Sequence, residues 1–68
     1  MNEYVFTVPP RTETLLAGKI HQELKGVTEK VDAVTVATHT YPWVVFVRCR
    51  QPLSEEERQH VEERIRQI

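Results

Sequence analysis

The chain has 68 residues, enough for one small domain, which we expect to span residues 1–68. A core of this size seldom contributes more than about 3–5 kcal/mol, and oligomerisation, a metal or disulfides usually add to it. The single cysteine excludes an internal disulfide, and a net charge of −1, from 9 basic and 10 acidic residues, excludes a global basic field for nucleic acid.

Membrane and export signals are not evident in the sequence. No segment approaches 18 apolar residues, so we expect no transmembrane helix. Residues 1–8 lack the basic region and the long apolar run of a signal peptide. We therefore expect a soluble, cytoplasmic protein.

The first half of the chain predicts a strand followed by a helix. Residues 3–8 alternate aromatic and β-branched side chains, and two prolines follow them, a pattern typical of a short strand and its end. Apolar residues then recur at helical spacing, and Gly26 is a natural helix terminus. The first helix is therefore predicted over about residues 12–25.

The second half predicts a hairpin followed by a helix. Residues 31–38 and 43–50 have strong β character, and the four residues between them, 39–42, make a hairpin loop of ordinary length. Ser54 and Glu57 then form the S-x-x-E pattern of a capping box. A second helix is expected to begin there.

The order of these elements, β-α-β-β-α, indicates the fold class. It is typical of an α+β two-layer sandwich, with a three-stranded sheet and both helices on one face. This arrangement is ferredoxin-like but lacks the last strand. The first β-α-β connection places the first strand beside the third, and we expect these two strands to be parallel. The first strand would then be an open edge, with Glu3 as its only charged residue to discourage pairing.

The length of the hairpin loop predicts the register and therefore the core. The expected core-facing pairs are Thr38–Trp43, Val36–Val45, Val34–Val47 and Asp32–Cys49. A loop of odd length would move valines onto the face of Arg48, which makes a worse core. We expect Tyr4, Phe6 and Val8 of the first strand to join this face.

The opposite face of the sheet is the candidate interface, because neither helix covers it in this arrangement. Its predicted site residues are Val5, Ala33, Ala37, Val44, Phe46, Arg48 and Arg50. A contiguous exposed apolar patch usually marks an interface. We therefore expect a non-enzymatic interaction, regulatory or accessory module. It would act through self-association of this face or of the open edge, as a homodimer or larger oligomer, or with an unidentified protein partner.

Candidate catalytic and cofactor residues are scarce. Cys49 is expected on the core face, with Arg48 and Arg50 on the other, so a buried and unreactive thiol is predicted. The Ser, Thr and acidic residues form no triad, and the two glycines form no phosphate loop. We expect no catalytic residue and no cofactor.

Two alternative functions remain open at this point. The segment VVFVRC, residues 44–49, resembles the third-strand signature of the RNA recognition motif, which implies single-stranded RNA binding through Phe46 and the nearby arginines. It departs from that signature in having no preceding glycine and only one aromatic residue. The other alternative is a metal or small-ligand site. It would require an oligomer to gather the histidines, because His21, His39 and His60 lack metal-ligand spacing.

Overall fold

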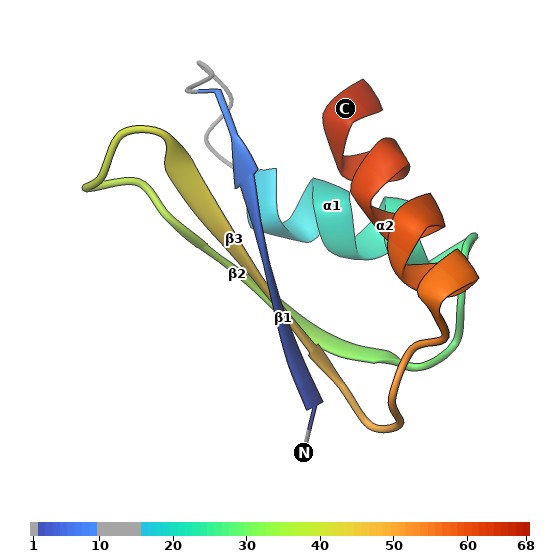
Figure 1. Cartoon of the computed structure of the whole chain (residues 1–68). Helices are drawn as coiled ribbons and strands as arrows, with labels where there is room; N and C mark the ends of the chain where they lie inside the picture. The colour runs from blue at the N-terminus through green and yellow to red at the C-terminus, as the bar shows by residue number, and fades with distance from the viewer. Residues whose placement is uncertain (1, 10–15) are drawn as a thin grey trace.

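The computed structural model describes residues 2–9 and 16–68, and it contains the predicted order of elements (Figure 1). They are β1 (Asn2–Val8), α1 (Leu16–Lys25), β2 (Val31–Ala37), β3 (Trp43–Cys49) and α2 (Glu55–Gln67). The strands form one three-stranded sheet, and both helices lie against the same face of it, so the α+β two-layer prediction is confirmed. The predicted start of the first helix, residues 12–15, lies outside the described residues.

The strand order is β1-β3-β2, which places β1 beside β3 as expected. The expected parallel pairing of these two strands is wrong, because both β1 and β2 run antiparallel to β3. The reason is geometric. The connection through α1 makes β1 parallel to β2, and the hairpin then reverses the direction of β3, which lies between them. The strand β1 is at one edge of the sheet and β2 at the other.

The observed register of the hairpin confirms the residue pairs predicted for its middle and differs from the prediction at one end. Val36 faces Val45, and Val34 faces Val47, as predicted. The predicted Asp32–Cys49 pair is wrong, because a β-bulge at Asp32 places Val31 opposite Cys49. A bulge adds one residue to one strand and turns the chain locally. Here it buries the apolar Val31 side chain and leaves the charged Asp32 exposed.

The core lies between the sheet and the two helices. Its buried residues are Phe6, Val8, Ile20, Leu24, Val31, Val45, Val47, Cys49, Val61 and Ile65, and Tyr4, Val34, Val36 and Trp43 pack against them while partly exposed. The predicted core face of the sheet is therefore confirmed. Since β3 is the central strand, its Val45 and Val47 side chains are fully buried.

The N-terminus of α2 is closed by the predicted capping box. The Ser54 hydroxyl accepts a hydrogen bond from the Glu57 backbone N–H at 3.1 Å, and the Glu57 carboxylate accepts one from the Ser54 N–H at 3.0 Å. This arrangement satisfies backbone donors that the first helical turn leaves without partners. The apolar stripe of α2 is narrow, with Val61 and Ile65 buried.

Candidate functional site: the open sheet face

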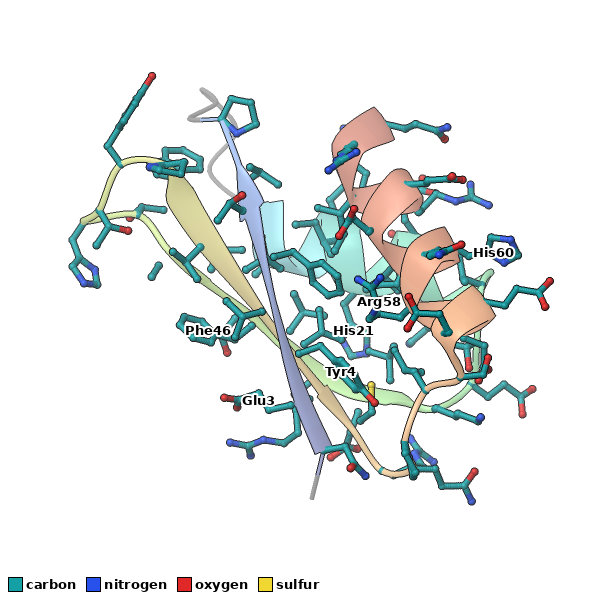
Figure 2. All side chains as sticks on the ribbon, in the orientation of Figure 1. Glu3, Tyr4, His21, Phe46, Arg58 and His60 are labelled. Carbon is teal, nitrogen blue, oxygen red and sulfur yellow. The ribbon has the colours of Figure 1, made fainter. Side chains whose placement is uncertain are left out.

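The side of the sheet that faces away from the helices carries the candidate site. Because side chains alternate along a strand, nine residues of the three strands point to this side. They are Glu3, Val5 and Thr7 of β1, Val44, Phe46 and Arg48 of β3, and Ala33, Thr35 and Ala37 of β2; we call this set the open face. Figure 2 shows Glu3 and Phe46 on this side and Tyr4 on the helix side.

The open face is ordered into three rows that run across the strands. The central row is Val5, Phe46 and Thr35, the row at one end is Glu3, Arg48 and Ala33, and the row at the other end is Thr7, Val44 and Ala37. Phe46 therefore lies at the centre, and both charged residues lie in one end row. Such a surface is apolar in the middle and charged at a single end.

The exposure of the open face differs from strand to strand. Val5 on the edge strand remains 58% exposed, while Phe46 and Val44 on the central strand are partly exposed between their neighbours. Arg48 is exposed. Among the described residues, no helix or strand packs on this face. A partner molecule can therefore contact these side chains.

Six of the seven predicted site residues come together on the open face, and the seventh lies beyond it. Arg50 follows the end of β3 and forms an ion pair with Asp32 at 3.7 Å, with both side chains more than half exposed. The predicted site residues do not include Glu3, Thr7 and Thr35, each of which completes one of the three rows. Strand alternation places all three on this face, so the sequence pattern could have included them.

The only cysteine is separated from this face. Cys49 is fully buried on the helix side of β3, as predicted. Burial raises the pKa of its thiol, the charge of Glu57 raises this pKa further, and the charge of Lys30 lowers it. Since the thiolate is the reactive form, the native environment of Cys49 does not favour nucleophilic chemistry.

The three histidines lie on three different elements. His21 is on α1, His39 is in the hairpin loop and His60 is on α2. His60 lines a polar hollow of about 390 Å³ between the end of α1 and α2, together with Glu63 and Arg64. Among residues 2–9 and 16–68 there is no group of three His, Cys, Asp or Glu side chains placed to bind a metal ion.

Comparison with known proteins identified no relative of this chain. The chain matches no protein-family model, and no curated protein or solved structure is significantly similar to it. In the described ranges, neither helix has the length and apolar character needed to cross a membrane. Function must therefore be inferred from the geometry of the chain itself.

Proposed function

We propose that the protein is a non-enzymatic interaction module that associates with copies of itself through the open face. The observation that supports this proposal is the position of Phe46, at the centre of a sheet face that neither described helix covers. Contiguous exposed apolar surface of this kind usually marks an interface. An accessory or regulatory role for a larger assembly fits the small size of the chain.

The energetic support comes from the apolar residues of the open face. Complete burial of an exposed Val or Phe side chain contributes about 1.5–3 kcal/mol. Val5 is 58% exposed, so it retains much of this contribution for association. A domain of this size is only marginally stable, and a few kcal/mol from a partner surface would be a large part of its total stability.

The arrangement of rows favours one way of stacking two copies face to face. One possible two-fold axis lies between the two sheets, runs perpendicular to the strands and passes beside Phe46. It would place Phe46 against Phe46 of the second copy. The row of Glu3 and Arg48 would then face the row of Thr7 and Val44 of the second copy. A two-fold axis along the strands would instead place Arg48 against Arg48. Because like charges in contact are destabilising, the first arrangement is favoured.

Single-stranded RNA binding is the alternative, and the charge arrangement weighs against it. Arg48 is directly opposite Glu3 in the sheet, and Arg50 is paired with Asp32. Both arginines near Phe46 thus have a carboxylate as neighbour. The open face also offers one aromatic side chain, Phe46, where base stacking platforms usually have two or more.

We further propose a cytoplasmic location and no catalytic role. The free thiol of Cys49 is compatible with a reducing compartment. A metal site would require histidines from different copies to meet. His21 and His60 lie on the helices, on the opposite side of the sheet from the open face, so the association proposed above does not by itself bring the histidines together.

Sedimentation velocity over a concentration series tests the proposal. The wild-type chain should sediment as an oligomer at high micromolar concentration, and Phe46→Glu should reduce its mass. The matched control is Gln22→Glu, which adds the same charge at an exposed position on α1 and should leave the mass unchanged. Circular dichroism should show that both variants fold.

Two results would refute the proposal: a wild-type chain that stays monomeric at high micromolar concentration, or a Phe46→Glu variant that remains fully assembled. A fluorescence titration with mixed single-stranded RNA at low salt examines the alternative, because the electrostatic contribution is strongest there. Saturable binding that Phe46→Glu abolishes would favour the RNA function instead.

A further inference from the structure

We propose that β1 of one copy pairs antiparallel with β1 of a second copy, which joins their sheets into one six-stranded sheet. This edge contact rests, like the proposed function, on self-association of the chain, but it uses a different surface. The strand that pairs with the free edge of β1 is β1 of the second copy.

The dimensions of the open face show why a second contact is needed. Three strands about 4.8 Å apart, each of seven residues at about 3.4 Å, give a face of about 14 Å by 24 Å, or roughly 340 Å². A stable interface buries about 800 Å² of each partner. One open face falls well short of this area, whereas the face of two sheets joined at β1 would be about twice as large.

The two edges of the sheet differ in how well they are protected against pairing. On β2, the bulge at Asp32 interrupts the regular edge, and the Asp32 carboxylate is paired with Arg50. Bulges and charges are common devices that prevent edge-to-edge association. On β1, all seven residues pair in unbroken register with β3, and the strand contains no Gly or Pro. Its single charge is Glu3. Of the two edges, β1 is therefore the one suited to accept another strand.

The sequence of β1 is compatible with pairing to itself in one register. A two-fold axis at Val5 places Val5 opposite Val5 and pairs every residue of the strand, from Asn2 to Val8. Glu3 would then face Thr7 of the second copy, so no like charges are opposed, and a Val–Val pair is favourable across antiparallel strands. Moving the axis to Tyr4 or Phe6 would leave two residues of each strand unpaired.

This pairing has a clear structural consequence. Because the two-fold axis would be perpendicular to the sheet, the helices of both copies would lie on the same side. The two open faces would form one continuous surface that carries Phe46 twice. Two such dimers could then stack through this wider surface, so the complete assembly would be a tetramer.

Disulfide trapping at the expected axis tests the inference. Directly opposed Cβ atoms of an antiparallel pair are about 4.5–5.5 Å apart, which is close enough for a disulfide after a small adjustment. Val5→Cys should therefore form a covalent dimer in mild oxidant. The wild-type chain should not, since Cys49 is fully buried. In the favoured face contact Val5 would also lie opposite Val5, but the backbones of stacked sheets are about 10 Å apart, beyond the roughly 7 Å between Cα atoms that a disulfide can span.

Two further variants examine the register. Glu3→Cys and Thr7→Cys should each remain unlinked alone and should form a mixed disulfide when combined, because residue 3 faces residue 7 of the second copy. Failure of a folded Val5→Cys variant to cross-link would overturn the inference, as would self-linking of Thr7→Cys. For the wild-type chain, the edge contact should give intermolecular NOEs between backbone Hα atoms of β1 in labelled and unlabelled copies, because stacked sheets about 10 Å apart are too distant to give them. Their absence in an assembled sample would also overturn the inference.

Combining the variants separates this inference from the proposed function. If both contacts exist, Phe46→Glu should reduce the tetramer to a dimer, and Val5→Cys should still cross-link in that background. If Phe46→Glu leaves the mass unchanged while Val5→Cys cross-links, the edge contact stands and the face contact fails. If Phe46→Glu yields monomers and Val5→Cys never cross-links, the face contact stands and the edge contact fails.

Discussion

The phenolic oxygen of Tyr4 accepts a hydrogen bond from the backbone N–H of Leu53 at 2.8 Å, across 49 positions of the sequence. This bond joins the first strand to the segment that leads into α2. Tyr4 lies on the core face of β1, so its ring packs against the core while its hydroxyl reaches this segment (Figure 2). The contact thus helps to position α2 over the sheet.

The Tyr4 hydroxyl is therefore expected to contribute to stability. Tyr4→Phe should lower the free energy of unfolding by about 0.5–1.5 kcal/mol, the usual net contribution of one hydrogen bond. Urea denaturation followed by circular dichroism measures this change. Tyr41→Phe is the matched control, because Tyr41 is 87% exposed, and this variant should unfold like the wild type. Equal stability of the two variants would show that the bond contributes nothing.

A second long-range contact connects the start of α2 to the segment before β2. The Glu57 carboxylate accepts hydrogen bonds from the Lys30 ammonium at 2.7 Å and from the Thr28 hydroxyl at 3.2 Å. The bond from Lys30 is the largest cause that lowers the pKa of Glu57 to about 2, and the bond from the Ser54 N–H is the next. The same carboxylate therefore caps the helix and binds the lysine.

This lowered pKa predicts a pH dependence of stability. A carboxylate with a lower pKa in the folded state stabilises the fold above its unfolded pKa, and the contribution is lost as pH falls through the folded pKa. For Glu57 the loss should occur between its ordinary value of 4.5 and about 2. Urea titrations from pH 7 to pH 2 should show a smaller decrease in unfolding free energy for Glu57→Gln than for the wild type.

The control for this prediction is Glu56→Gln, which removes a neighbouring carboxylate of the same turn that does not contact Lys30. It should retain the wild-type decrease between pH 4.5 and pH 2. If Glu57→Gln and Glu56→Gln change the pH profile equally, the Lys30 contact is not the source of the dependence.

The bulge at Asp32 predicts the effect of a deletion. Val31 faces Cys49 and Ala33 faces Arg48, which are adjacent on β3, so Asp32 is the one extra residue of β2. Removing Asp32 should leave a regular ladder with the same core-facing side chains. The β2 edge would then lose both its bulge and its charge, and sedimentation should detect larger assemblies than those of the wild type.

A substitution separates the bulge from the charge. Asp32→Asn keeps the extra residue but removes the carboxylate that pairs with Arg50, and it should change the assembly size less than the deletion does. A deletion variant that folds but sediments like the wild type would show that the bulge does not protect this edge.

The sequence by itself determined the parts of this protein that depend on local spacing. The capping box of Ser54 and Glu57 places both partners within one helical turn. The four-residue hairpin loop sets Val36 opposite Val45, and two-residue alternation then assigns Phe46 to the face away from the helices. Each of these features follows from residues that are near one another in the chain, so the pattern predicts it directly.

Only the tertiary structure decided the relations between distant segments. The bulge forms because the core accepts Val31 and excludes Asp32, which depends on what surrounds the end of β2. The opposition of Glu3 and Arg48, which makes one end of the open face charged, requires two strands 45 residues apart to be in register. Long-range packing sets that register, and local sequence patterns do not report it.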